Sequence, residues 1–380
     1  MKTLQISKFY PPVMGGIESV AFEIAEGMSQ LGLKSDVLCS NMSSETTSEV
    51  SAAGYRIVRA GSWGKLLSTS MSPALILKVK QMCDDYDIIH VHMPDPMAAL
   101  AVWIARPRGR IVLHWHSDVV NQRRALKLYE PLQDWLMRRA DAIIATTRAY
   151  AESSPALRAW KSKVHVVPIG VSPLSANHAH THAQTLRQRY PGKKIVFSLG
   201  RMTYYKGFDV LISAARSLPD DAIVLVGGGG ELLQRYRDRV RSESLSEKIE
   251  FVGRIPDDEI LGYFAASTIF CLSSIVRAEA YGVVLIEAMA MGLPIVATDI
   301  PGSGVPWVNQ HGVTGLNVAV GDPDALARAL CTLLENPDVA TQFGRAGQAR
   351  YLERLTAATM VESIVELYRQ VLARPNASDA

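Results

Sequence analysis

Short apolar, β-branched runs alternate with amphipathic stretches along the whole chain. The runs LQIS, DVLC, YRIV, IIHVH, RIVLH, AIIAT and KVHVVP predict strands in the first half, and KIVFSLG, AIVLVG, IEFVG, IFCLS, PIVAT and TGLNV predict strands in the second. Between them lie helical patterns such as residues 16–31, where Ile17, Val20 and Met28 share one face. Strand and helix in repetition predict an α/β fold with parallel sheets covered by helices on both faces.

The alternation is interrupted between residues 168 and 192. This segment has prolines, glycines and small polar residues, including histidines near residues 177–182, and no long apolar run, so we predict a mobile linker. It separates two doubly wound domains, residues 1–172 and 173–355, and residues 356–380 add a last helix. Because ligands of such sheets bind beyond the carboxyl ends of the strands, we expect a ligand in a cleft between the two domains.

The length of 380 residues, 48% of them hydrophobic, fits two domains. No apolar run is long enough for a transmembrane helix, and the N-terminus is typical of a first strand, not a signal peptide. The four cysteines are scattered without a metal or disulfide spacing, which favours a reducing cytoplasm; they are Cys39, Cys83, Cys271 and Cys331.

The net charge is only +3, but lysines and arginines concentrate between residues 106 and 163. Tryptophans lie in or next to this region at positions 103, 115, 135 and 160. The combination indicates a patch that docks on an anionic membrane surface. The alternative is ordinary solvated surface with the tryptophans in the core. Nucleic acid is disfavoured as a partner because no recognised binding motif accompanies the charge.

The loop GRMTYYKG directly follows the first strand of the second half. Arg201 and Lys206 lie five residues apart between its glycines, where a strand gives way to a helix. A planar guanidinium and a compact ammonium together can neutralise a diphosphate, including the charge that develops when it leaves. The alternative is two solvated surface cations.

The block RAEAYGVVLIE places two carboxylates, Glu279 and Glu287, eight residues apart before the run AMAMGLPIVAT. If a helix begins within residues 281–284, its amides point at an anion near Glu279, and Glu287 can reach a diol such as ribose. The alternatives are a helix N-terminal acid with a solvated glutamate, or an acid/base pair of the glycosidase kind, which leaves the phosphate-binding surroundings unexplained.

Two motifs of the first half follow predicted strands. Gly15 and Gly16 precede the first helix, where backbone amides can approach a phosphate, although a plain tight turn is the alternative. His116, in HWHSD, is placed to hydrogen-bond a sugar or phosphate, or it is a packed core residue. His90 and His92 alternate on one strand and so share a face; a zinc site is conceivable, but no further acidic or thiol ligand is obvious.

Two Asp-x-Asp sequences could bind a metal–diphosphate complex. The first, at residues 85–87, precedes a buried strand, and the second, at residues 322–324, has the pattern of a helix cap. We therefore predict that the protein uses no metal and no other cofactor.

These motifs, in this order and spacing, resemble those of family-4 glycosyltransferases of the GT-B fold over nearly the whole chain. The resemblance includes GGIE, YDIIHVHMP, HSD, GRMTYYKG and EAYGVVLIEAMAMGLPIVAT. It implies two Rossmann-like domains facing across a cleft, a last helix crossing back to the first domain, and transfer with retention at the anomeric carbon.

The resemblance also implies roles for single residues. Arg201 and Lys206 would hold the diphosphate of a nucleotide-sugar donor, and Glu279 and His116 would lie beside the transferred sugar. Glu287 would bind ribose. Further positions are implied in donor binding: Gly15 and Gly16 at the phosphate and acceptor side, Gly253, Arg254 and Ile255 beside the base, and Ala280, Tyr281, Gly282 and Val283 around the sugar and phosphate.

The segments GRMTYYKGFDVLI and GSGVPWVNQHGVTGL are particularly similar to bacterial exopolysaccharide and O-antigen mannosyltransferases. That similarity implies GDP-mannose as donor and a polyprenyl-diphosphate glycan as acceptor. Together with the basic region at residues 106–163, it leads us to expect a peripheral position at the inner face of the cytoplasmic membrane. A UDP-sugar donor (GlcNAc, GalNAc, Gal or Glc), a nucleotide-sugar epimerase and a non-catalytic nucleotide-sugar-binding protein remain alternatives. One departure is that residues 302–306 read GSGVP where many members carry Gly-Gly-x-x-Glu.

Overall fold

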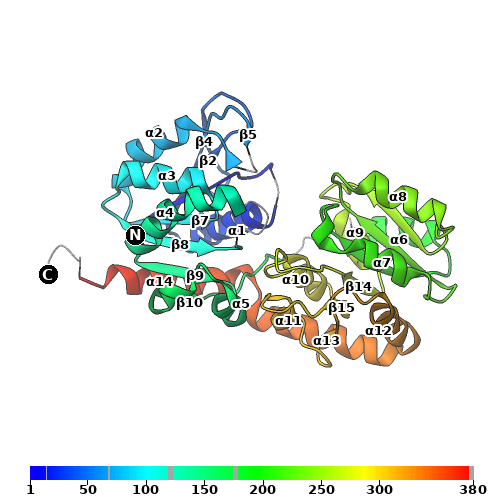
Figure 1. Ribbon diagram of the computed structural model, residues 1–380. Coiled ribbons are helices and arrows are strands. Elements are labelled where there is room, and N and C mark those ends of the chain that lie inside the picture. Colours follow the sequence, from blue (N-terminus) through cyan, green and yellow to red (C-terminus); the bar gives the residue numbers. More distant parts are fainter. Residues whose placement is uncertain (14, 67–68, 119–122, 174–178, 376–380) are drawn as a thin grey trace. The chain divides into compact units, whose positions relative to one another are not determined.

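The computed structural model describes residues 1–13, 15–66, 69–118, 123–173 and 179–375, without the side chains of residues 123–128 and 179 (Figure 1). The chain divides into two compact units. Unit 1 comprises Met1–Ser172 and Thr356–Ala380, and unit 2 comprises Pro173–Leu355. Each unit is built on one main parallel sheet and is described separately below.

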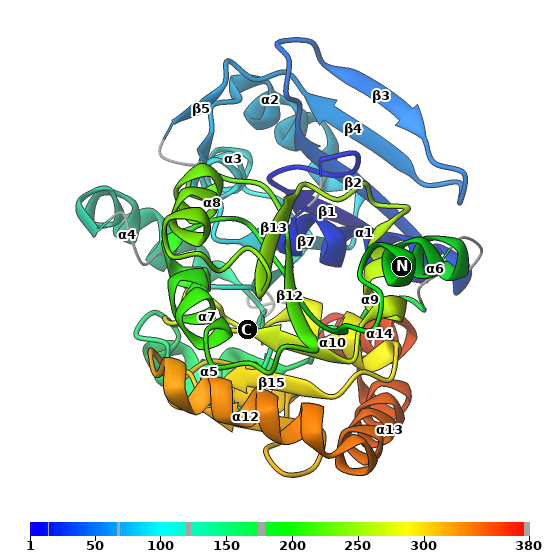
Figure 2. The same cartoon turned by 90° about the vertical axis from the view of Figure 1, so that its right-hand side faces the viewer.

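Unit 1 contains an eight-stranded sheet in the order β10-β9-β8-β7-β1-β2-β4-β3. All neighbouring strands are parallel except β3 and β4, an antiparallel pair at the edge that Figure 2 shows clearly. The edge strand and a two-stranded hairpin, β5 and β6, were not predicted. The strands are β1 (Lys2–Ser7), β2 (Lys34–Ser40), β3 (Thr47–Val50), β4 (Arg56–Ala60), β5 (Lys65–Leu66), β6 (Thr69–Ser70), β7 (Ile88–Met93), β8 (Arg110–Trp115), β9 (Ala142–Ala145) and β10 (Val164–Val166).

The helices of unit 1 pack in two groups. Helix α2 packs on α3 and α3 on α4, while α1 packs on α14. Strand-to-strand crossovers that run in opposite directions along a parallel sheet place their helices on opposite faces, which explains the two groups. The helices are α1 (Gly16–Gln30), α2 (Pro73–Met82), α3 (Pro96–Ala105), α4 (Arg123–Arg139), α5 (Arg148–Ser153) and α14 (Ala357–Leu372), with short 3₁₀ turns at Cys83–Asp85 and Arg158–Lys163.

Helix α14 is the last element of the chain and belongs to unit 1. The chain re-enters this unit through a parallel bridge between Val171 and Thr356, and the Thr356 hydroxyl caps α14 by accepting from the Thr359 amide at 3.1 Å. A Cβ atom at Gly27 of α1 would lie only 2.7 Å from the Val361 side chain. Gly27 is therefore what lets α1 and α14 approach so closely.

Unit 2 contains a six-stranded, fully parallel sheet in the order β13-β12-β11-β14-β15-β16. Its strands are β11 (Lys194–Leu199), β12 (Ala222–Gly227), β13 (Ile249–Gly253), β14 (Ile269–Leu272), β15 (Ile295–Thr298) and β16 (Gly315–Val318). Its helices are α6 (Ala179–Arg189), α7 (Phe208–Ala215), α8 (Leu233–Ser242), α9 (Ile260–Ala266), α10 (Val283–Ala290), α11 (Val305–Val308), α12 (Pro323–Glu335) and α13 (Pro337–Arg354), with a 3₁₀ turn at Tyr204–Lys206.

The predicted linker at residues 168–192 is wrong in its second part. Helix α6 lies there and packs against α9, burying Ala183 and Leu186, while residues 174–178 lie outside the described part of the chain. A Cβ at Gly262 of α9 would lie 2.3 Å from the His182 Cβ, so the two helices touch at a glycine. Helix α6 was missed because only Ala183 and Leu186 anchor it and every other position after Ala179 is polar.

The basic region at residues 106–163 is only partly a free surface. Trp115 is buried in the core, as the alternative prediction had it, whereas Trp103 is 42% exposed. The Arg110 guanidinium pairs with Asp141 at 2.9 Å, and the Lys163 ammonium donates to the Ala140 carbonyl at 2.8 Å. Among the described residues, no helix combines the length and apolar character that a membrane crossing requires.

Candidate functional site

Three loops of unit 2 meet at the carboxyl edge of its sheet, after β11, β12 and β13. The Gly200 amide donates to the Gly227 carbonyl at 3.0 Å, and the Gly228 amide donates to the Gly253 carbonyl at 2.7 Å. The loop that carries Arg201 and Lys206 is thereby joined, through the glycine run after β12, to the turn at residues 253–255. Two of the sequence-predicted segments are brought together in this way.

The glycine run at residues 227–230 was not singled out from the sequence, although four consecutive glycines after a strand are a readable signal. Gly228 has φ +128°, and a Cβ there would lie 2.0 Å from the Gly200 carbonyl oxygen. A Cβ at Gly227 would lie 2.4 Å from the Ile255 side chain. At Gly228 both the positive φ and the contact with backbone require glycine, whereas at Gly227 the Ile255 side chain would have to move.

Lys206 and Glu279 form a largely buried ion pair at this edge. The Lys206 Nζ lies 2.6 Å from the Glu279 Oε2, and the Ser274 hydroxyl donates to the same oxygen at 2.9 Å. Both charged side chains are 11% exposed. A Cβ at Gly200 would lie 3.0 Å from the Lys206 Cε, so this glycine leaves room for the lysine stem.

The Glu279 carboxylate stabilises the protonated form of Lys206. Burial by itself lowers the pKa of the Lys206 ammonium, but the Glu279 carboxylate outweighs it, and the pKa is raised above its ordinary value. The positive charge of Arg201 acts in the opposite direction and lowers that pKa. Arg201 itself is exposed. The site therefore offers one paired cation and one solvent-facing cation.

The loop that carries Glu279 rests on residues 302–306, the segment that departs from the family pattern. The Ser303 hydroxyl donates to the Glu279 carbonyl at 2.5 Å, and the Gly304 amide donates to the Ala280 carbonyl at 2.7 Å. Serine and glycine in this segment thus support the backbone that positions the carboxylate.

Helix α10 begins at Val283, directly after Gly282, which has φ +80°. This start lies inside the range expected for the helix. Ala280 and Tyr281 are buried just before it, and Glu287 lies partly buried one turn along the helix. At the turn after β13, Ile255 is buried and Arg254 is exposed.

At the corresponding edge of unit 1, Gly15 is the N-cap of α1 with an extended φ of −176°. A Cβ at Gly15 would lie 2.5 Å from the Glu18 Oε2, whereas one at Gly16 would meet nothing within 4 Å. Burial raises the pKa of the Glu18 carboxyl, against the lowering effect of Lys8 and Lys65. The glycine at position 15 therefore makes room for an acidic side chain of the same turn.

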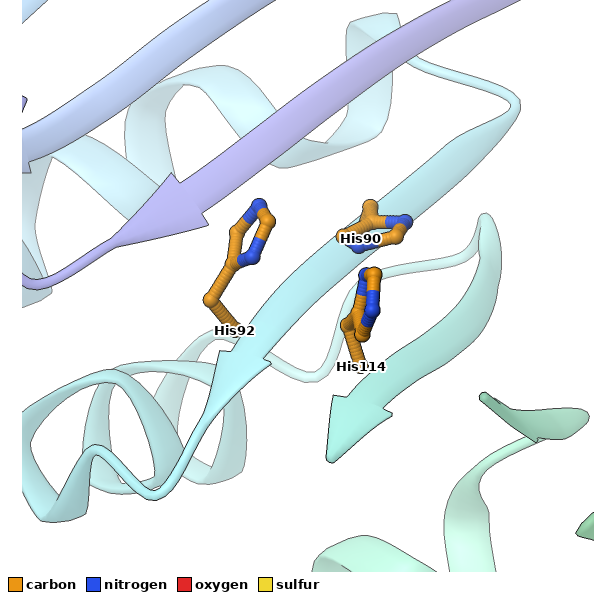
Figure 3. A group of neighbouring side chains, drawn as sticks. All are labelled: His90, His92 and His114. Atoms are coloured by element: carbon orange, nitrogen blue, oxygen red, sulfur yellow. The ribbon is translucent and has the colours of Figure 1, made fainter. Parts of the chain in front are cut away.

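Four histidines of unit 1 form one buried array on β7 and at the end of β8. Figure 3 shows His90 and His92 projecting from β7, with His114 facing them from β8. His92 and His114 are register partners, and the rings of His114 and His116 stack with centroids 4.3 Å apart. Burial lowers the pKa of all four imidazoles, that of His114 to about 3, so they are neutral at pH 7.

His90, His92 and His114 could hold a metal ion, because one ring nitrogen of each lies within 4.8 Å of the others. However, both nitrogens of His92 already have partners, His116 Nε2 at 2.9 Å and Gln5 Oε1 at 3.0 Å. The trio contains no carboxylate or thiolate to balance a buried dication. A metal ion here would have to break a hydrogen bond of His92.

The Asp-x-Asp sequences have structural partners. The Asp322 side chain caps α12 by accepting from the Ala325 amide at 2.8 Å, as the pattern predicted. Asp87 accepts from the Lys2 amide at 2.8 Å, and the Tyr86 hydroxyl donates to Asp36 at 2.6 Å.

Comparison with known proteins links both units to described families. Residues 14–173 match the model of Glycosyltransferase Family 4, and residues 185–350 match Glycosyl transferases group 1. The chain is 31% identical to O-antigen chain mannosyltransferase C of Escherichia coli, covering 98% of this chain and 99% of that protein. It is 30% identical to D-rhamnosyltransferase WbpZ of Pseudomonas aeruginosa, covering 94% of this chain and 93% of that protein.

Among solved structures, Anabaena Alr3699/HepE in complex with UDP-glucose superposes with a TM-score of 0.78 at 21% identity, covering 97% of this chain and 100% of that chain. This likeness supports the fold alone. Together with the two parallel sheets it confirms the predicted α/β GT-B fold.

Proposed function

The chain belongs to the family-4 glycosyltransferases, and we propose from its site that it transfers mannose, with retention, from GDP-mannose to a polyprenyl-diphosphate-linked glycan. The observation that carries the proposal is the Lys206–Glu279 pair at 2.6 Å, set among loops that only glycine allows to pack. Such loops bring backbone amides close to a ligand, and a cation there suits a phosphate. The relative named for O-antigen chain mannosyltransferase activity supports mannose and surface-polysaccharide synthesis.

In the proposed mechanism the donor diphosphate competes with Glu279 for Lys206. Arg201, exposed beside the pair, contributes the second cation. As the bond from the anomeric carbon to phosphate loosens, both cations stabilise the negative charge that develops on the departing diphosphate. The acceptor hydroxyl attacks from the same face, and a leaving phosphate oxygen takes its proton. Glu279, once released, faces the sugar.

The remaining site residues complete the donor site in this proposal. Glu287 on α10 binds the ribose diol, and His116 lies beside the sugar. The other donor contacts are Gly15 and Gly16, the turn Gly253, Arg254 and Ile255, and the loop Ala280, Tyr281, Gly282 and Val283. We further propose that no metal takes part, and the engagement of the Asp322 carboxylate in capping α12 supports this. Activity that persists in excess EDTA tests this point.

The proposed donor, GDP-mannose, has specific alternatives. The likeness to a protein solved with UDP-glucose supports a UDP-sugar as one alternative donor, and the rhamnosyltransferase relative supports a donor of rhamnose as another. Thermal shift against a panel of nucleotide-sugars separates them, because a ligand that binds only the folded state stabilises it. The largest shift is expected with GDP-mannose, and a larger one with any UDP-sugar would contradict the GDP assignment.

We propose that unit 1 binds the lipid-linked acceptor at an anionic membrane surface on the cytoplasmic side. Trp103, 42% exposed, together with the exposed Arg106 and Arg108 at the end of α3, supports this. Tryptophan and arginine at an exposed helix end are suited to the interface between lipid headgroups and acyl chains. Co-sedimentation with vesicles containing anionic lipid is expected to exceed that with neutral vesicles, and to weaken in Trp103→Ala.

A further inference from the structure

A chain of hydrogen bonds runs from the core of unit 1 to His116. The Gln5 Nε2 donates to the Ser35 hydroxyl at 3.1 Å, and the Gln5 Oε1 lies 3.0 Å from the His92 Nε2. The His92 Nδ1 in turn lies 2.9 Å from the His116 Nε2. Gln5, Ser35, His92 and His116 are all buried, so water does not compete along the chain.

The direction of these hydrogen bonds follows from the inventory of donors and acceptors. A carbonyl oxygen such as Gln5 Oε1 only accepts, so the His92 Nε2 must carry a proton. Burial lowers the pKa of His92, which is therefore neutral, and its Nδ1 can only accept. The His116 Nε2 must then carry the proton donated to His92. His116 is neutral as well, so its Nδ1 keeps a lone pair.

We propose that Gln5 and His92 are positioning residues that fix His116 in the Nε2-protonated form, so that its Nδ1 accepts a hydrogen bond from a substrate hydroxyl. Among the described residues, none is a hydrogen-bond partner of that Nδ1. A lone pair repels an anionic phosphate oxygen and attracts a hydroxyl hydrogen, so the residue selects a hydroxyl. That the substrate is a sugar rests on the proposed function, whereas the protonation state does not.

The register of the strands explains why these hydrogen bonds can form. His92 on β7 is paired across the sheet with His114 on β8, and His116 follows two residues later on the same face. Gln5 on the neighbouring strand β1 is register partner of His90, two residues before His92. Strands β1 and β7 and the residue that follows β8 therefore bring Gln5, His92 and His116 into a line that ends at the carboxyl edge of the sheet.

The first experiment reads the protonation state directly in the full-length protein. Nitrogen-15 NMR of histidine-labelled protein at pH 7 is expected to show His116, assigned by comparison with His116→Gln, with a protonated Nε2 and an unprotonated Nδ1. A protonated Nδ1 would overturn the proposal, because it requires the Gln5 amide to be reversed. Stoichiometric zinc on His92 would overturn it too, since a metal-bound Nδ1 cannot accept from His116.

The second experiment tests the consequence for transfer. His92→Phe is expected to lower kcat about tenfold, the effect of losing one buried hydrogen bond, while the thermal shift with the donor is kept. His92→Gln, whose amide can still bond both neighbours, is expected to recover part of the loss. His90→Phe is the matched control, because it lies on the same strand and face, outside the chain, and should change kcat less than twofold. Equal losses in His90→Phe and His92→Phe would contradict a positioning role.

Deoxy substrates identify the hydroxyl. The hydroxyl that donates to the His116 Nδ1 lies either on the donor sugar or on the acceptor. A substrate that lacks this hydroxyl is expected to slow the wild-type enzyme about tenfold, and to slow His92→Phe no further. Additive losses for every deoxy donor and every deoxy acceptor would refute the proposal.

If the protein transfers no sugar at all, the proposed function fails, yet the NMR result still decides the state of His116. If His92→Phe does not fold, Gln5→Leu serves in its place.

Discussion

The carboxyl edges of the two sheets differ in the charge of their buried polar side chains. In unit 2 the edge carries full charges, the Lys206 ammonium and the Glu279 carboxylate 2.6 Å apart, with Arg201 exposed beside them. In unit 1 the corresponding edge carries the Glu18 carboxyl beside Gly15, and next to it lies an array of neutral, buried imidazoles that ends at His116. Charges suit a diphosphate whose negative charge grows during transfer, and neutral acceptors suit hydroxyls. In the proposed reaction, the difference assigns the diphosphate to unit 2 and a substrate hydroxyl to unit 1.

The two edges should also respond to opposite ends of the pH scale. The pKa of Lys206 is raised, so the pair stabilises unit 2 fully below the ordinary lysine pKa, and this contribution is lost as pH rises through the raised value. The pKa values of the histidines are lowered, so unit 1 is stable above the ordinary histidine pKa and loses that stability as pH falls.

The largest expected effect comes from removing the charge of unit 2. Lys206→Ala is expected to lower kcat by about 10²–10³-fold, because the developing charge on the diphosphate loses a preorganised cation. Initial rates with saturating donor and acceptor measure this. Lys193→Ala is the control, since the Lys193 Nζ bonds the Asp220 carbonyl at 2.6 Å, at the amino end of the sheet. A Lys206→Ala enzyme with wild-type rates would refute the role assigned to the pair.

Substitutions in the glycine run test whether the stability of unit 2 depends on the close packing of its loops. Gly228→Ala is expected to destabilise the protein by about 3 kcal/mol, because alanine at φ +128° is strained and its Cβ would meet the Gly200 carbonyl. Gly229→Ala is the matched control, since a Cβ there meets nothing within 4 Å. Urea denaturation of both variants gives the difference, and equal free energies of unfolding would contradict the packing argument.

The strand and helix alternation made the fold predictable, because both faces of each parallel sheet are covered and its strands are continuous apolar runs. The chemistry was only partly predictable. Arg201, Lys206 and Glu279 could be named from their motifs, but Lys206 and Glu279 are 73 residues apart, and nothing in the chain specifies that they pair directly. Likewise, two histidines in one strand and two in or just after the neighbouring strand are visible in the sequence, whereas their alignment depends on the register of β7 with β8.

Acid titration tests whether the buried histidines of unit 1 are held neutral by the fold. His114 has a pKa of about 3, and among the described residues neither ring nitrogen has a hydrogen-bond partner. Each such histidine makes the free energy of unfolding fall by about 1.4 kcal/mol per pH unit below its ordinary pKa. His114→Leu is therefore expected to flatten the loss of stability between pH 6 and pH 4, a window set by the cited shift. Urea denaturation across that range checks it, with the exposed His180→Leu as control; parallel curves for wild type and His114→Leu would contradict the assignment.

The smallest expected effect concerns the segment where this chain departs from its family. The Ser303 hydroxyl donates to the Glu279 carbonyl, so Ser303→Ala is expected to cost about 1 kcal/mol of stability, the net value of one hydrogen bond. Because the lost contact is to the backbone and not to the carboxylate, the ion pair should survive, and kcat should fall several-fold less than in Lys206→Ala. Ser217→Ala, elsewhere in unit 2, is the control for a serine substitution. If Ser303→Ala abolished transfer while keeping stability, Ser303 would have to contact the sugar itself, and the departure from Gly-Gly-x-x-Glu would then be a change of substrate recognition instead of a change of support.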